Sequence, residues 1–203
     1  MTFLLSEDDA LRKHLQGIVV HDQKADGSNT ERQVGVWFGQ PDQELREQRY
    51  PYITIDMIDV NREPDREMRG MVRSGAPNVQ YLAPTDLQNP DEKAWEIELP
   101  IPVGIDYQIT AYSRHPRHDR EIVAQMMYSK LPLRFGQVDL DDGTVRRLEV
   151  LDYAKRDMTE QGKRLFIISV TVRIISEVNQ GIYHLLTSVQ EVNLSDISEI
   201  NRH

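Results

Sequence analysis

The chain has 203 residues, of which 39% are hydrophobic and 28% are charged. This length and balance are ordinary for a globular protein with a sizeable core, and they exclude an intrinsically disordered chain. The formal net charge of −9 opposes general DNA binding, and the absence of cysteine excludes disulfides, thiolate nucleophiles and cysteine-ligated zinc.

The sequence also bears on the compartment. No apolar stretch approaches the ~20 residues that cross a bilayer, so we expect no membrane span. The opening residues MTFLLSEDD turn acidic at once and have no basic region, so we expect no signal peptide. The lack of cysteine fits folding in a reducing cytoplasm.

Near the N-terminus the pattern predicts a short helix. Ser6 is a candidate N-cap because three acidic residues follow it, and Gly17 ends the helix after about Gln16. Further along, the patterns predict a strand at 18–20, a turn at 26–29 and a half-buried strand at 34–38.

Residues 52–60 predict a strand in which Ile53, Ile55 and Met57 share one face. Residues 61–94 then carry several prolines and many charges of both signs. A loop of this length is unusual inside a compact domain, so we interpret this segment as a proline-rich charged insertion. Alternation resumes at 95–101, where Pro100 and Pro102 predict an edge or bulged strand.

The clearest signal lies at 103–111, where apolar residues occupy every second position and predict a strand with one buried face. A helix follows, with Asp119 as its expected N-cap and Pro132 after its end. Its apolar residues recur at helical spacing: Ile122, Val123, Met126, Met127 and Leu131.

The C-terminal half of the pattern predicts a hairpin and one more long strand. The hairpin spans 138–145 around a turn that contains Gly143, and the strand spans 164–176. Beyond Gly181 the spacing fits a strand and a helix equally well.

Together these elements predict an α+β fold. We expect a mixed or antiparallel sheet of about four to six strands with one main amphipathic helix packed on it, plus an N-terminal helix and the long insertion. We expect a single domain over 1–203, with the insertion at 61–94 and a C-terminal extension at 182–203.

A metal-dependent nuclease is the first enzyme alternative. Such sites place a Pro-Asp and an acid-x-Lys on neighbouring strands, and Pro64-Asp65 and Asp91-Glu92-Lys93 match these letters. Both lie in the insertion, where no strand pattern holds the carboxylates in register. Charged residues are also so common in this segment that such a match is expected by chance.

Two polar clusters have a structural explanation as well as a functional one. His115, His118 and Asp119 suit a metal or phosphohydrolase site, but further ligands are missing, and a capped strand-to-helix turn explains them better. Asp56, Asp59 and Asp106 could converge as an acidic cluster, but a solvated sheet face also explains them.

A modest basic stretch includes Arg146, Arg147, Lys155, Arg156, Lys163 and Arg164, and nearby acids offset it. The Met126-Met127 pair is more often core than a binding surface. We therefore expect no enzyme activity, no catalytic, cofactor-binding or metal-binding residues, and no cofactor.

Three segments together resemble a known family. They are YPYITIDMIDV, VGIDYQITAYSRHPRHDREIVAQMM and RLFIISVTVRI. In pattern and order, over about 50–60 and 103–178, they look like the core of the tail terminator proteins of tailed bacteriophages, also called tail completion or neck proteins. The resemblance includes no catalytic motif, and the insertion and the residues after Gly181 exceed that core.

The resemblance implies a structural virion protein. Such a protein forms a ring, usually a homohexamer, at the head-proximal end of the tail, where it stops tube growth and joins the head connector. The implied partners are copies of this chain, the tail tube protein, the head–tail connector and in some tails the sheath, with DNA passing through unbound. Assembly would occur in the bacterial cytoplasm. Another head–tail connector or tail-associated subunit is the alternative.

Overall fold

We describe the protein from a computed structural model over residues 3–23, 28–39, 50–75, 94–160, 162–181 and 183–186. The chain divides into two compact units. The first comprises Met1–Glu63 and Pro102–Ser176, and the second comprises Pro64–Ile101 and Glu177–His203. The predicted single domain over 1–203 stays a prediction. Among the described residues, no helix combines the length and the apolar character needed to span a membrane.

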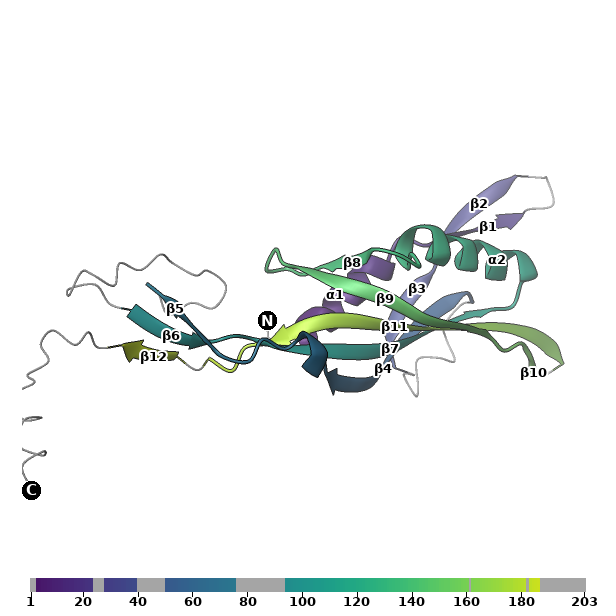
Figure 1. The fold of residues 1–203 in the computed structure, drawn as a ribbon. Helices are drawn as coiled ribbons and strands as arrows, with labels where there is room; N and C mark the ends of the chain where they lie inside the picture. The colour runs from purple at the N-terminus through teal and green to yellow at the C-terminus, as the bar shows by residue number, and fades with distance from the viewer. Residues whose placement is uncertain are drawn as a thin grey trace, which may run out of the picture. The chain divides into compact units, whose positions relative to one another are not determined.

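The first unit is built on a seven-stranded mixed sheet (Figure 1). Its hydrogen-bonded order is β3 (Gly35–Phe38), β4 (Tyr52–Arg62), β7 (Ile101–Ser113), β11 (Lys163–Val178), β9 (Val145–Lys155) and β8 (Gly136–Asp139), with β10 (Met158–Glu160) paired to β11. β3 and β4 are parallel, whereas the β4–β7, β11–β9 and β8–β9 pairs are antiparallel. The predicted α+β class is confirmed, with more strands than the four to six expected.

The two long strands alternate as their sequences predict. On β7 the alternate residues Val103, Ile105, Tyr107, Ile109 and Ala111 are buried, and on β11 the alternate residues Phe166, Ile168, Val170, Val172 and Ile174 are buried. β4 follows the prediction only in part. Ile53 and Ile55 are fully buried, but Met57 is half exposed, although it still pairs with Tyr107 in the same register. A β-bulge follows directly, between Met57 and Asp59.

Helix α1 (Leu5–Leu15) begins two residues earlier than expected. The predicted N-cap, Ser6, is wrong: Leu4 occupies the cap, and its backbone N–H donates to Glu7 Oε2 at 2.9 Å. Glu7 therefore does the capping from inside the first turn. Gly17 follows the helix with φ of +84°, a conformation that glycine adopts without strain.

Helix α2 (Pro116–Gln125) also begins earlier than predicted. Pro116 fits the first helical position, so His115 becomes the N-cap and its Nδ1 accepts from the Arg117 N–H at 3.3 Å. The prediction of Asp119 as N-cap is therefore wrong. A π-helical turn, Met126–Lys130, continues the helix. Its wider turn keeps Met126 and Leu131 buried although they are five residues apart.

Two hairpins complete the first unit. The predicted β8–β9 hairpin is confirmed, and Gly143 supplies the positive φ in its turn. A second hairpin pairs β1 (Val19–Gln23) with β2 (Asn29–Gln33). The turn predicted at 26–29 lies partly outside the described residues.

The second unit contains a three-stranded sheet in the order β12 (Tyr183–Leu186), β6 (Ala94–Glu98) and β5 (Met71–Ser74). The expected edge or bulged position of the 95–101 strand is wrong, because β6 pairs with a strand on each side without a register shift. β6 lies in the middle of this sheet, paired with β12 and with β5. It ends at Glu98, before Pro100, so no proline within β6 removes an N–H group from the pairing. Within the described part of the insertion lie the end of β4, a 3-10 turn at Pro64–Arg66 and β5. The ambiguous segment after Gly181 forms a strand at 183–186.

Candidate functional surface

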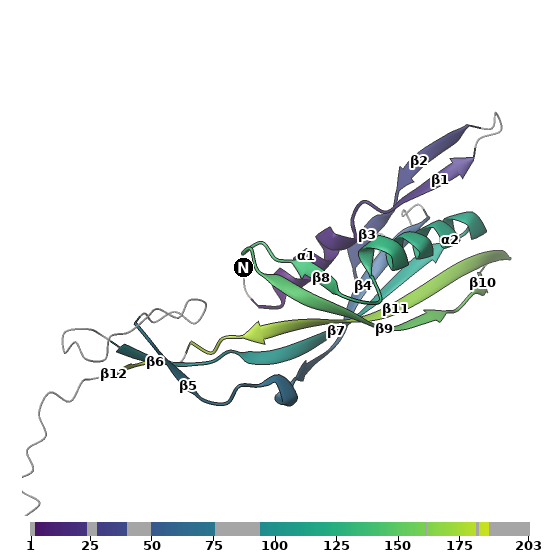
Figure 2. The same ribbon diagram turned by 45° about the horizontal axis from the view of Figure 1, so that its top comes forward.

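The central sheet has one face covered by helices and one that no described helix covers. Both α1 and α2 lie on the same side in Figure 1 and in Figure 2. Side-chain contacts agree with this arrangement. The Tyr107 hydroxyl donates to Asp8 Oδ1 of α1 at 2.7 Å, the Ser176 hydroxyl donates to Glu7 of α1, and Lys155 Nζ donates to Asp119 of α2.

The opposite side, here called the helix-free face, carries the alternate residues of the same strands. Its polar contacts join strand to strand. Gln108 Nε2 donates to Ser169 Oγ at 3.3 Å, and the Thr110 and Ser169 hydroxyls lie 3.3 Å apart. The period of two therefore gives this sheet an apolar side and a hydrogen-bonded polar side.

The helix-free face has an acidic balance. In the described strand pairing, its carboxylates outnumber its guanidinium groups by six to two. The acids are Asp56, Asp59, Asp106, Asp139, Glu149 and Asp152, and the bases are Arg147 and Arg173. Such a face repels polyanions.

One ion network is built into this face. Arg173 donates to both carboxylate oxygens of Asp106, at 2.7 and 2.9 Å, and to Glu63 Oε1 at 3.1 Å. The hydrogen bonds that Arg173 donates to the Asp106 carboxylate raise the pKa of Arg173, so the guanidinium keeps its charge. A Cβ on Gly104 would lie 2.8 Å from Glu63 Oε1 and 3.1 Å from Arg173 Cδ, so glycine leaves room for the network.

The structure brings only part of the predicted acidic cluster together. Asp59 and Asp106 are opposite each other in the β4–β7 register, but Asp106 is held by Arg173. Asp59 accepts from the Val60 N–H at 2.8 Å and from Asn61 Nδ2 at 3.1 Å. Asp59 and Asp106 thus each have their own donors, and no three acidic or histidine side chains that the structure describes are arranged to share a metal ion here.

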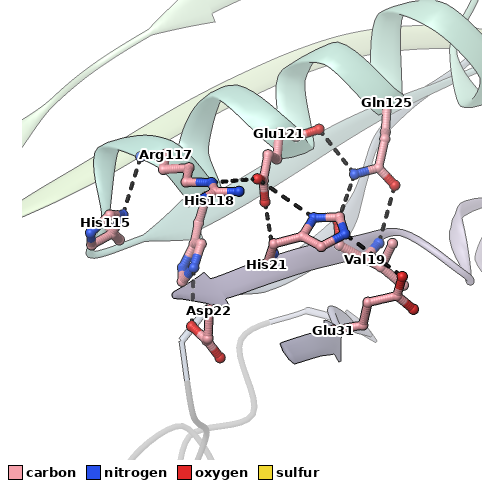
Figure 3. A network of polar contacts seen from close by, with 9 residues as sticks. All are labelled: Val19, His21, Asp22, Glu31, His115, Arg117, His118, Glu121 and Gln125. Carbon is pink, nitrogen blue, oxygen red and sulfur yellow. Dashed lines mark hydrogen bonds and ion pairs between the residues drawn. The ribbon is translucent and has the colours of Figure 1, made fainter. Parts of the chain in front are cut away.

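The histidine-rich turn belongs to a second polar network, drawn in Figure 3. His118, Glu121 and Gln125 follow one another at helical spacing on the side of α2 that faces β1. Glu121 Oε2 accepts from the backbone N–H of His21 at 2.8 Å. The Gln125 amide donates to the Val19 carbonyl at 2.6 Å and accepts from the Val19 backbone N–H at 3.1 Å. These contacts fasten the β1–β2 hairpin to α2.

His118 is the buried member of this network, and its Nε2 lies 3.1 Å from Asp22 Oδ1. Burial lowers the pKa of His118, more than the Asp22 carboxylate raises it. The His115 ring lies 5.0 Å from the His118 ring and also opposes its protonation. Among the described residues, no three His, Asp or Glu side chains are arranged to share a metal ion.

The nuclease pattern does not assemble in the part of the chain that the structure describes. Asp65 lies in the 3-10 turn Pro64–Arg66, away from any strand pairing. Asp91, Glu92 and Lys93 lie outside the described residues.

The basic stretch is paired with local acids. Arg147 lies 2.8 Å from Glu149, and Arg164 lies 3.1 Å from Asp157. Met126 is buried in the core, whereas Met127 is 41% exposed, so the two methionines divide between core and surface.

Sequence reasoning missed the partners of these networks. The opposite charges of Asp106 and Arg173 on two predicted strands were a usable signal, but the adjacency of β7 and β11 was needed to pair them. For His21, Asp22 and Glu121 no local signal existed, because the hairpin and α2 are about a hundred positions apart in the sequence.

Comparisons with known proteins reveal structural similarity, whereas sequence comparisons do not. No protein-family model matches the chain, and the comparison with curated proteins finds no match. The chain is similar to a solved structure described as the sheath/tube terminator of an extracellular contractile injection system, PVC, in its extended state. The identity is 13%, the TM-score is 0.43, and the match covers 95% of this chain and 62% of that one. This chain thus spans less than two thirds of that protein's length.

Proposed function

We propose that this chain is a structural, non-catalytic subunit of a phage-type tail, a tail terminator that forms a ring, hexameric by the family pattern. In this proposal the ring sits at the head-proximal end of the tail, stops tube growth and joins the tail to the head connector. The observation that supports it best is the broad sheet with a packed apolar side and an acidic helix-free side.

The physical reason concerns the DNA that must pass through such a ring. A channel wall rich in carboxylates repels the phosphate backbone, so DNA slides without sticking. The Asp106–Arg173–Glu63 network, with its guanidinium neutralised on the sheet, adds no free cation that would hold phosphate. We assign the helix-free face to the channel.

The proposed partners follow from the role. They are further copies of this chain in the ring, the tail tube, the head–tail connector and, in a contractile tail, the sheath. The proposal needs no cofactor, no metal and no membrane, and it places the protein in the virion after assembly in the bacterial cytoplasm.

Deletion of the gene in its phage tests the proposal. We expect tails of abnormal length that fail to join heads, and complementation with the intact gene should restore both properties. Electron microscopy of tagged particles should find the protein at the head-proximal end of the tail.

Two results would point elsewhere. Tails of normal length with empty or leaking heads would favour a head-side connector. A metal-dependent cleavage activity that Asp65→Ala or Glu92→Ala abolishes would overturn the structural assignment.

A further inference from the structure

The central sheet is left open along half of β4. β3 pairs with β4 only from Tyr52 to Ile55, and from Asp56 to Arg62 no described strand lies on that side. This open stretch, here called the β4 edge, carries exposed aliphatic side chains. Ile58 is 54% exposed and is the extra residue of the bulge in the β4–β7 pair. Exposed apolar groups on an open edge are a ready surface for association.

The other edge of the central sheet is open in the same way. β8 pairs with β9 only from Val145 to Leu148, and from Glu149 to Lys155 no described strand lies on that side. This stretch, here called the β9 edge, also has a bulge. Leu151 is its extra residue and is 48% exposed. Edges that avoid pairing often carry a charge at such a position, whereas both of these carry a large aliphatic side chain.

A pocket adjoins the β9 edge. It has a volume of about 420 Å³ and lies between Leu133–Phe135 and Arg147–Leu151. The Phe135 side chain at its rim is 94% exposed, and its φ of +59° is left-handed, which costs a non-glycine residue roughly 1–2 kcal/mol. An aromatic ring held out in water beside a pocket suits a surface that a partner covers.

The two edges complement each other, because one carries exposed side chains where the other has a pocket, and because their charges differ in sign. The β4 edge offers the exposed Met57 and Ile58, and the β9 edge offers the pocket. Asp56 and Asp59 accompany the first, whereas two arginines, Arg134 and Arg147, line the second against one carboxylate, Glu149. Opposite charges around an apolar contact favour one orientation of two surfaces and suppress others.

Strand direction adds an independent argument. β4 is antiparallel to β7, and β11 is antiparallel to β9. β7 and β11 also run in opposite directions, because Asp106 meets Arg173 whereas Thr110 meets Ser169. β4 and β9 are therefore opposed in direction. When copies repeat in one orientation, a β4 edge meets the next copy's β9 edge antiparallel, the commoner of the two strand arrangements.

We infer that the β4 edge of one copy docks on the β9 edge of the next, with Ile58 entering the pocket beside Phe135. The partner is thus a second copy of this chain, bound head to tail through two different surfaces. Such heterologous contacts repeat around a closed ring when their rotation closes. The inference rests on the proposed ring and names the surfaces that build it.

Cysteine cross-linking tests the contact, because the chain contains no cysteine. Purified Ile58→Cys and Leu151→Cys chains are mixed and treated with a short bismaleimide. We expect a dimer in the mixture and little in either chain alone. A chain that carries both Ile58→Cys and Leu151→Cys should give a series of cross-linked oligomers that ends at one size, that of the closed ring. Leu5→Cys, at a 63% exposed aliphatic in the same unit, is the matched control.

A charge variant gives a second readout. Ile58→Glu should lower formation of oligomers by about tenfold, while Leu5→Glu leaves it unchanged, with both circular dichroism spectra as in the parent. Ile58→Cys dimers formed without Leu151→Cys would show a two-fold contact between β4 edges and overturn the inference. Cross-linking no stronger than in the Leu5→Cys control would also overturn it.

The outcome is separable from that of the proposed function. If Ile58→Glu complements the gene deletion and tails are normal, the contact is wrong and the terminator role stands. If deletion itself leaves tail length and head joining normal, the role is wrong whatever the cross-links show.

Discussion

On the helix-covered face of the central sheet, Ile105 and Ile109 are fully buried. The side chains of their neighbours on β7, Asp106 and Gln108, point to the opposite, helix-free face. The covered face is apolar and packed by two helices, and the helix-free face is acidic and crossed by ion pairs. This difference shows how one strand can serve stability and function separately. Because the two sets of side chains do not touch, charge on one face can change without disturbing the core on the other.

The largest expected effect comes from adjacent positions on β7. Ile109→Ala should lower the free energy of unfolding by about 2–5 kcal/mol, because it opens a cavity between the sheet and the helices. Gln108→Ala, on the helix-free face, should change it by about 0.5 kcal/mol or less. Urea unfolding followed by circular dichroism measures both, and equal losses would remove the contrast between the faces.

The ion network is a place where we expect the helix-free face to contribute clearly to stability. Arg173→Met leaves Asp106, whose side chain is 14% exposed, without its main donor, so we expect a loss of about 1–3 kcal/mol. Adding Asp106→Asn should recover part of this loss.

Arg147→Met is the matched control on the same face, because this side chain is 63% exposed and its ion pair is screened by solvent. We expect a change of about 0.5 kcal/mol or less. If both arginine variants unfold alike, the network has no special role.

The layer that covers the apolar face should respond to acid through His118. Its pKa is lowered in the folded protein, so the folded state binds this proton less readily than the unfolded chain. The stability that neutral His118 contributes is therefore present above pH 6.5, the ordinary pKa of histidine, and is lost as the pH falls below that value. Asp22, His115, His21 and Arg32 are the charged or titratable neighbours of this ring.

His118→Gln should therefore reduce the drop in melting temperature between about pH 7.5 and about pH 5.5. His184→Gln, at an exposed position on β12, is the control and should leave that drop unchanged. An identical acid response in parent and His118→Gln would remove His118 from the explanation.

The smallest expected effect concerns DNA. The parent chain should not bind a DNA duplex measurably, and Asp139→Lys with Asp152→Lys should give weak binding that salt abolishes. Glu31→Lys with Asp65→Lys makes the same change in net charge outside this face. Fluorescence anisotropy of a labelled duplex compares them, and equal binding by both pairs would show that total charge decides and the face does not.

Several of these features follow from local sequence alone. The alternation at 103–111 and 164–176 determined two central strands and their buried faces, because side chains in a strand point alternately to opposite sides. The glycine turn of the β8–β9 hairpin was equally local. Helix starts were less secure, since Glu7 and His115 took capping roles that sequence reasoning gave to Ser6 and Asp119.

Strand order, edges and long-range pairs were decided only by the tertiary structure. Sequence placed Asp106 and Arg173 on polar faces, but the adjacency of β7 and β11 made them an ion pair. Likewise Ile58 and Leu151 look like ordinary strand residues until the shortness of β3 and β8 leaves their edges open. Such properties arise from which segments meet in space, and a one-dimensional pattern records only what each segment does by itself.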